Sequence, residues 1–202
     1  IVHTAEEAAL FAPEDPEYVP ELQPQVYLPI TPYFSSTAAA TPELRAKGVQ
    51  SSIEPSINKD LISAGFFSNR HGFSAVGNNH NLFGYYQSTN ASFSVTTRTQ
   101  DGLGSGWGSD SARNIDLVDY QAASVRALEK AEASSSSKTL EPGNYPVILE
   151  PQAVSDFMRF GSYALNARTA DEGRSFFSKA GGGNKTGEKV AGDNVTMRSD
   201  PT

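Results

Sequence analysis

The sequence contains no cysteine, two methionines, one tryptophan and three histidines among its 202 residues. Without cysteine, the chain has no disulfide, no cysteine-ligated zinc and no cysteine nucleophile of its own. The histidines are His3, His71 and His80, and none of them forms the pair one helical turn apart that is typical of hydrolytic zinc sites. We therefore expect no catalytic residue, no metal ligand and no cofactor-binding residue in this chain.

Positive charge and long apolar runs are also scarce. There are 16 lysines and arginines against 23 acidic residues, which gives a net charge of −7, and the basic residues form no run. Nucleic-acid binding requires clustered basic side chains, so we expect no nucleic-acid partner. No apolar stretch approaches the roughly 18 residues of a membrane span, and the start "IVHTAEEAAL" has no signal-peptide pattern. The composition favours a cytoplasmic protein that has no membrane partner.

One glycine-rich stretch, "AGGGNKTGEK" at 180–189, resembles a phosphate-binding loop. Such a loop needs lysine directly after its last glycine, where the ammonium reaches the terminal phosphates. Gly182 and Gly187 have the required separation, but Glu188 follows them, and its carboxylate would repel phosphate. We predict a mobile surface loop that does not bind nucleotide.

The remaining motifs do not indicate a catalytic nucleophile or a general acid or base. Serine is abundant, so a Ser-His-Asp site stays open, but no G-x-S-x-G motif is present. The "GSG" at 104–106 lacks the strand-turn-helix context of a nucleophile elbow. Asp171 and Glu172 are adjacent, so on a helix they would point in different directions, and we interpret them as a solvated helix end.

The pattern along the chain predicts an α+β fold: a small antiparallel sheet with packed helices, followed by the start of a second, β-rich domain. Residues 1–40 are expected to form a proline-rich extended arm, 41–140 an α+β domain, and 141–202 the beginning of another domain. Both ends look cut from a longer protein. A helix at 5–12 is expected before the arm.

Two helices are predicted in the 41–140 domain. The first begins with Thr41 as N-cap and Pro42 at its first position, and Pro55 should kink or interrupt it. The second covers 119–133, with Val125 and Leu128 facing inward.

Period-two alternation predicts strands at 64–77, 81–88 and 91–99, separated by turns at "GNNHN" and "STN". In the last strand one face carries Ala91, Phe93, Val95 and Thr97, which indicates a half-buried antiparallel strand. The glycine-rich segment 101–111 is expected to be irregular. Beyond it we predict a strand at 145–150, a helix at 151–173 and an extended segment at 194–199.

Three stretches, in order, resemble the PmbA/TldD family, whose members are known as modulators of DNA gyrase and as metallopeptidases. The first is "NNHNLFGYYQSTNASFSVTTRTQDGLGSGW" (78–107). The second is "ALEKAEASSSSKTLEPGNYPVILEPQAVSDFM" (127–158), and the third is "ADEGRSFFSKAGGGNKTGEKVAGDNVTMRSDPT" (170–202). Together they cover more than half of the chain. The resemblance implies a central piece of a three-domain protein, with 141–202 opening the metallopeptidase-like C-terminal domain.

The family resemblance also implies a division of roles. TldD-like members carry H-E-x-x-x-H on the helix after the segment similar to "YPVILEP", where two histidines and a later cysteine hold zinc. In this chain the corresponding region, "MRFGSYALNARTADEGRSFF", contains no histidine. The resemblance therefore implies a PmbA (TldE)-like subunit that lacks zinc and acts with a TldD-like partner or by self-association on peptide substrates. An active metallopeptidase whose site lies further along the protein, or a pure scaffold, stays open.

Overall fold

The computed structural model describes residues 1–199 and divides the chain into two compact units, 1–138 and 139–202. The last three residues of the predicted 141–202 domain lie outside the described part. Each unit is considered by itself. Within residues 1–199, no helix combines the length and apolarity that crossing a bilayer requires.

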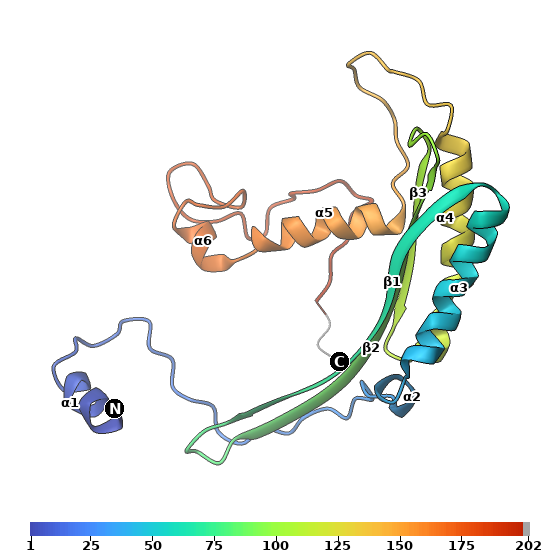
Figure 1. Cartoon of the computed structure of the whole chain (residues 1–202). Coiled ribbons are helices and arrows are strands. Elements are labelled where there is room, and N and C mark those ends of the chain that lie inside the picture. The colour runs from blue at the N-terminus through green and yellow to red at the C-terminus, as the bar shows by residue number, and fades with distance from the viewer. Residues whose placement is uncertain (200–202) are drawn as a thin grey trace. The chain divides into compact units, whose positions relative to one another are not determined.

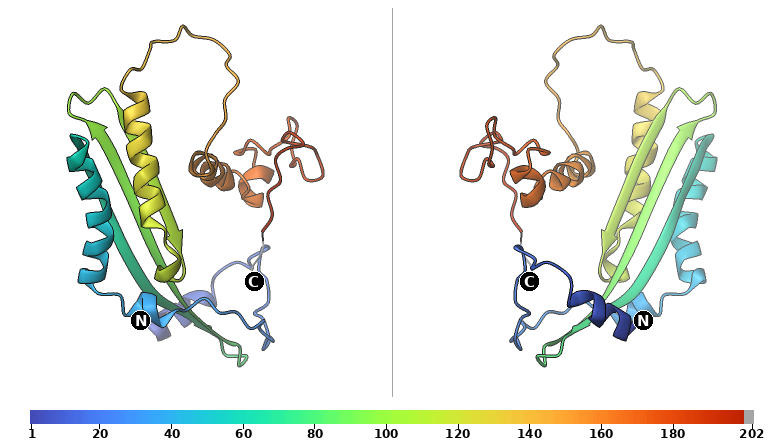
Figure 2. Two further views of the ribbon diagram at one scale, coloured as in Figure 1. Left: turned by 90° about the vertical axis from the view of Figure 1, so that its right-hand side faces the viewer. Right: turned by 90° about the vertical axis from the view of Figure 1, so that its left-hand side faces the viewer.

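The first unit is built on a three-stranded antiparallel sheet in the order β1 (Leu61–Gly77), β2 (Phe83–Thr99), β3 (Ser105–Ala112). Helices α3 (Pro42–Asn58) and α4 (Tyr120–Ser134) lie on the same face of this sheet (Figures 1 and 2). Shorter elements complete the unit: α1 (Val2–Ala9), α2 (Ser35–Ala38) and the 3₁₀ helix η1 (Ile115–Leu117). The α+β prediction, with an antiparallel sheet and packed helices, is confirmed.

Strands β1 and β2 form a hairpin that is much longer than β3. They pair along their whole length, from Leu61 opposite Thr99 to Gly77 opposite Phe83. Strand β3 pairs only with residues 91–98 of β2. The outer half of the hairpin therefore extends beyond β3, as the green ribbon at the bottom of Figure 1 shows.

The core lies between the sheet and the two helices. The predicted inner face of β2 is confirmed, because Ala91, Phe93, Val95 and Thr97 are all buried. The ring of Phe93 meets the ring of Phe67 edge to face at 5.6 Å between centroids, which is a favourable aromatic geometry.

The predicted break at "STN" is wrong, since β2 runs through these residues as one strand. Thr89 is buried there; its hydroxyl donates to the carbonyl of Arg113 at 2.9 Å, and its N–H donates to the carbonyl of Pro32 at 3.0 Å. These partners satisfy the turn-forming side chain within an extended backbone.

The irregular segment predicted at 101–111 is also wrong, because most of it is strand β3. A Cβ added at Gly106 would lie 2.0 Å from the carbonyl oxygen of Ala127, and one at Gly108 would lie 2.0 Å from that of Ala123. The glycines therefore let the backbone of α4 approach the strand directly. Two residues of a strand cover about 6.7 Å along its axis, and four residues of a helix cover about 6.0 Å along its axis. Glycines at every second position of β3 therefore lie opposite alanines at every fourth position of α4.

Helix α3 begins as predicted: Pro42 is its first residue, and the hydroxyl of Thr41 accepts from the N–H of Leu44 at 3.4 Å. The helix is not interrupted at Pro55 but continues to Asn58. Its last turn is held by packing, since the buried hydroxyl of Ser56 lies 2.6 Å from that of Ser63 on β1.

The buried faces of both helices consist of small residues, with Leu128 as the one exception. On α3 they are Gly48, Ser52 and Ser56, and on α4 they are Ala123, Ser124, Ala127, Leu128 and Ala131. The inward position predicted for Leu128 is confirmed, but that for Val125 is wrong, because its side chain is 50% exposed. The buried residues of α4 recur at positions 123, 124, 127, 128 and 131, and Val125 is turned about 100° beyond that face.

The second unit contains α5 (Pro151–Tyr163) and α6 (Ala167–Asp171). The predicted helix start at Pro151 is confirmed, but the single helix 151–173 is wrong, because Asn166 caps a separate helix. No strand is present at 145–150, where Ile148 is fully exposed, nor at 194–199. Among residues 139–199, the one bridge between extended segments pairs Ser178 with Asn184.

Candidate functional site

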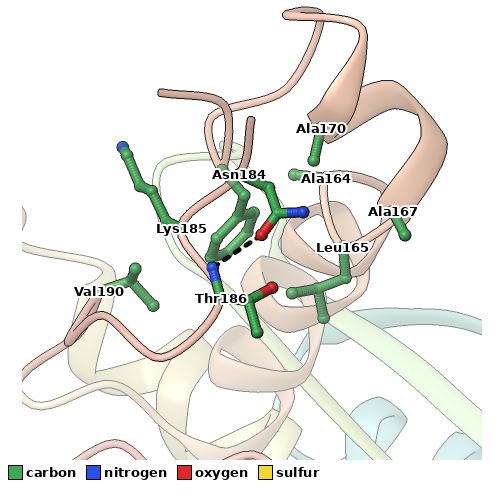
Figure 3. Close-up of a pocket in the computed structure, with 9 residues that line it drawn as sticks. Ala164, Leu165, Ala167, Ala170, Asn184, Lys185, Thr186 and Val190 are labelled. Atoms are coloured by element: carbon green, nitrogen blue, oxygen red, sulfur yellow. Dashed lines mark hydrogen bonds between the residues drawn. The ribbon is translucent and has the colours of Figure 1, made fainter. Parts of the chain in front are cut away.

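The second unit contains a small hollow of about 260 Å³ between the end of α5, helix α6 and the loop at 180–190 (Figure 3). Apolar side chains form most of its wall, together with three polar residues; the lining residues are Ala164, Leu165, Ala167, Ala170, Phe177, Asn184, Lys185, Thr186 and Val190. The hollow therefore suits a small, mostly apolar group rather than a phosphate.

The polar groups at this hollow are engaged with the chain itself. The side-chain oxygen of Asn184 accepts from the N–H of Thr186 at 2.9 Å, and its amide nitrogen donates to Asp171 at 2.7 Å. The ammonium of Lys185 donates to the carbonyl of Phe176 at 2.8 Å and lies 4.4 Å from the centroid of its ring. Asn184 and Lys185 therefore hold the loop in shape.

The glycine-rich loop that sequence analysis considered for phosphate is a compact turn. Gly181, Gly182, Gly183 and Gly187 all have positive φ, a conformation that other residues rarely adopt. The carboxylate of Glu188 forms an ion pair with Lys179 at 2.7 Å, so this acidic side chain neutralises a nearby ammonium.

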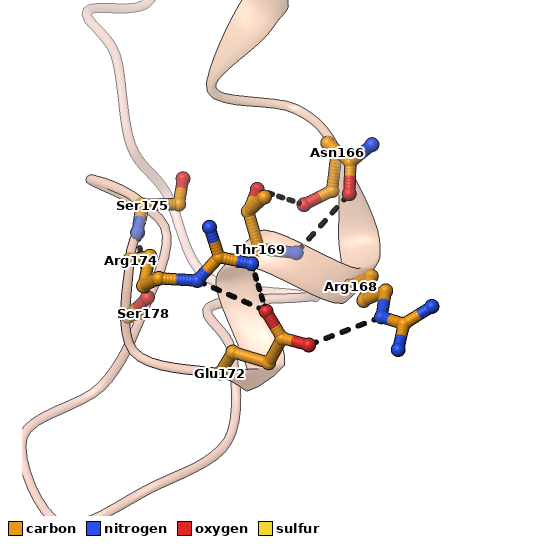
Figure 4. Close-up of polar contacts among 7 residues, drawn as sticks. All are labelled: Asn166, Arg168, Thr169, Glu172, Arg174, Ser175 and Ser178. Atoms are coloured by element: carbon orange, nitrogen blue, oxygen red, sulfur yellow. Dashed lines mark hydrogen bonds and ion pairs between the residues drawn. The ribbon is translucent and has the colours of Figure 1, made fainter.

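The predicted helix end at Asp171 and Glu172 is confirmed, and its carboxylates have structural partners (Figure 4). Glu172 accepts from Arg174 and from Arg168, each through Nε at 3.0 Å. The hydrogen bonds from Arg174, first, and Arg168 hold the pKa of Glu172 below its ordinary value. A carboxylate kept ionised in this way is a poor general acid.

The three histidines, for which the sequence predicts no metal role, lie apart from one another in the structure. His71 lies on β1, 3.3 Å from the side chain of Gln87 and edge to face with Tyr33, while His80 lies in the β1–β2 turn, 4.0 Å from Glu21. His3 lies 3.5 Å from Glu7 on α1. Across residues 1–199, no three histidine or acidic side chains gather as metal ligands would.

Comparison with protein families assigns both units. The PmbA/TldA metallopeptidase central domain matches residues 38–135, and the PmbA/TldA metallopeptidase C-terminal domain matches residues 142–202. The chain belongs to the PmbA/TldD family. The family is one of TldD/TldE-type metallopeptidases, so the resemblance stated from the sequence is confirmed. No match was found among curated protein sequences.

Solved structures share the PmbA/TldD fold with this chain. A protein described as a modulator of a DNA gyrase from Thermotoga maritima is 19% identical, with a TM-score of 0.71 over 83% of this chain and 40% of its own. A similarly described protein from Bacteroides thetaiotaomicron is 17% identical, with a TM-score of 0.70 over 87% of this chain and 43% of its own. TldE from Thermococcus kodakarensis is 18% identical, with a TM-score of 0.52 over 65% of this chain and 31% of its own. The chain spans less than half the length of each.

Proposed function

We propose that this chain is part of a PmbA (TldE)-like, non-catalytic subunit of a TldD/TldE-type zinc metallopeptidase complex. The complex would act in the cytoplasm on unfolded peptides or small precursor peptides. The zinc and the catalytic glutamate would belong to a TldD-like partner, while this subunit would help to enclose the substrate.

One observation carries the proposal. All three histidines of the chain precede residue 81, and the chain has no cysteine. Helices α5 and α6 and the loops around them therefore contain neither a histidine nor a cysteine that could bind zinc. Catalytic zinc sites use three protein ligands, commonly including a histidine pair on one helix. Asp171 and Glu172, at the end of α6, are engaged with Asn184 and two arginines. Asp156, on α5, accepts a hydrogen bond from Gln152 at 3.1 Å.

The test is to purify the full-length protein alone, the TldD-like partner alone, and the two together. We expect zinc and cleavage of an unfolded peptide only in samples that contain the partner, with faster cleavage in the complex. The matched control is a partner in which the glutamate of H-E-x-x-x-H is replaced by glutamine; it should retain zinc and lose cleavage.

Two results would contradict the proposal. Stoichiometric zinc and cleavage in the full-length protein alone would favour an active metallopeptidase instead. Failure of the full-length protein to bind the partner, or to change its activity, would favour a scaffold without a peptidase role.

A further inference from the structure

The proline-rich arm, residues 13–34, is held on the β1–β2 hairpin at one end by buried hydrogen bonds. Thr89 of β2 is 3% exposed; its N–H donates to the carbonyl of Pro32 at 3.0 Å, and its hydroxyl accepts from the N–H of Phe34 at 3.0 Å. The same hydroxyl donates to the carbonyl of Arg113 at 2.9 Å, so it both accepts and donates. One buried threonine therefore ties this end of the arm to the sheet.

Further toward its start, the arm meets the turn of the hairpin through exposed groups. The side-chain amide of Asn78 donates to the carbonyl of Leu22 at 2.9 Å, and the imidazole of His80 lies 4.0 Å from the carboxylate of Glu21. The side chains of His80 and Glu21 are 46% and 54% exposed, so their attraction by itself is weak. The arm runs beside the outer half of the hairpin between these contacts and Thr89 (Figure 1).

The stretch of the arm between its two attachments is hardly buried. Every residue from 13 to 31 is exposed, whereas Pro32 is buried. Tyr27 approaches the strand where β2 has a glycine: a Cβ added at Gly84 would lie 3.2 Å from the Tyr27 hydroxyl oxygen. A segment with so few buried contacts opens at a low free-energy cost, so the arm can leave the hairpin while its Pro32 end stays attached.

The arm and the outer half of the hairpin carry opposite charges. The arm has four acidic residues and no lysine, arginine or histidine, while residues 69–89 have one arginine, two histidines and no acidic residue. These charged or titratable residues are Glu14, Asp15, Glu17 and Glu21 in the arm, and Arg70, His71 and His80 in the hairpin. Opposite charges attract over about 10 Å at moderate ionic strength, so the arm is drawn toward this part of the hairpin.

We propose that the arm is a strap that is hinged at Thr89 and closes along the hairpin, and that protonation of His80 tightens its far end. The inference concerns the first unit and does not depend on the proposed function. Histidine changes its charge between about pH 5 and 8, and Glu21 is the charged side chain that faces His80. Protonated His80 therefore stabilises the closed strap, and this stabilisation is lost as the pH rises through the range in which histidine loses its proton.

His71 also meets the arm, but at the hinged end. Its ring lies 5.3 Å from the ring of Tyr33 between centroids, and its Nε2 lies 3.3 Å from the side-chain nitrogen of Gln87. Both of these neighbours are uncharged at neutral pH, and the arm is already held here by Thr89. Protonation of His71 should therefore change the closure of the strap much less than protonation of His80.

Proteolysis of the full-length protein tests the closing of the strap. The measured quantity is the rate of chymotrypsin cleavage after Tyr27, divided by the rate for a synthetic peptide of residues 18–34 at the same pH. This ratio removes the pH dependence of the protease. We expect the ratio to rise about two- to fivefold between about pH 6 and about pH 8, as for one exposed ion pair.

The variants His80→Gln and Glu21→Gln should give the high ratio at both pH values. The matched control is His71→Gln, a change of the same kind at the hinged end, which should keep the pH dependence of the parent. An equal ratio at the two pH values in the parent, or a pH dependence that persists in His80→Gln, would overturn the inference.

Hydrogen exchange at the amide of Phe34 tests the hinge. In Thr89→Val this amide loses its acceptor, and we expect it to exchange about tenfold faster, while Thr89→Ser keeps the hydroxyl and the slow rate. The matched control is Thr97→Val, which removes a buried hydroxyl from the same strand but leaves the arm untouched. Equal acceleration in Thr89→Val and Thr97→Val, or fast exchange in Thr89→Ser, would contradict the hinge. Circular dichroism of each variant establishes that it is folded.

Discussion

Because the backbones of α4 and β3 lie in direct contact at Gly106, adding a single methyl group there should strongly destabilise the first unit. In Gly106→Ala, the new Cβ would lie 2.0 Å from the carbonyl oxygen of Ala127 and 2.6 Å from the N–H nitrogen of Ala131. An ordinary contact begins near 3.4 Å, so α4 would have to move away from β3 by about 1.4 Å. Both neighbours are backbone atoms of a helix, which no rotamer change can move.

We expect the free energy of unfolding of Gly106→Ala to fall by about 3 kcal/mol, the upper end for overpacking. With a urea m-value of about 2 kcal/mol/M, the midpoint would fall by about 1.5 M. The fluorescence of Trp107, the only tryptophan and a residue of β3, reports this unit directly.

The matched control is Gly72→Ala. Gly72 also lies in a strand, but a Cβ added there meets no atom within 4 Å. Its free energy of unfolding should stay unchanged or rise by up to about 1 kcal/mol, because alanine restricts the unfolded chain. If the two variants lose stability equally, close packing of α4 on the glycines is refuted.

Further predictions concern the core, the second unit and the loop. Phe93→Ala, which removes a side chain that is 1% exposed, should cost about 3–5 kcal/mol in urea unfolding. Thr97→Val breaks a 2.7 Å hydrogen bond with Ser63 at nearly constant volume and should cost about 1 kcal/mol. Because the pKa of Glu172 is lowered, its ion pairs with the two arginines should persist as the pH falls through the ordinary value of 4.5 and be lost only at lower pH. Titration of the Glu172 carboxyl followed by NMR should show this, and Arg174→Gln should raise the pH at which that carboxyl is half protonated. Titration calorimetry with MgATP should show no binding, and measurable affinity would refute our interpretation of the loop at 180–189.

Sequence patterns predicted the parts of the fold where large side chains alternate or a cap is explicit. Alternation in β2 identified its buried face, and Thr41 with Pro42 identified the start of α3. The candidate site was predicted less well. The hollow in the second unit is formed by residues from α6, from the segment preceding it and from a loop, and no sequence pattern links these segments.

The strand predicted at 145–150 failed for a different reason. Its apolar run indicates burial, yet Val147 is 71% exposed and Ile148 is fully exposed, and no strand within residues 1–199 pairs with it. A strand needs a hydrogen-bonding neighbour, which a local pattern cannot specify.

Helix–sheet packing escaped prediction because it depends on residues that hydrophobic periodicity ignores. Glycine at 104, 106 and 108 suggests an irregular loop when each is considered alone, and alanine at 123, 127 and 131 suggests only helix propensity. Considered together, the two spacings advance by nearly the same distance along a strand and along a helix, so they predict a direct backbone contact. This close contact also determines which strand edge α4 covers. Because small residues bring α4 close to β3, side chains of α4 reach the carbonyls of that edge.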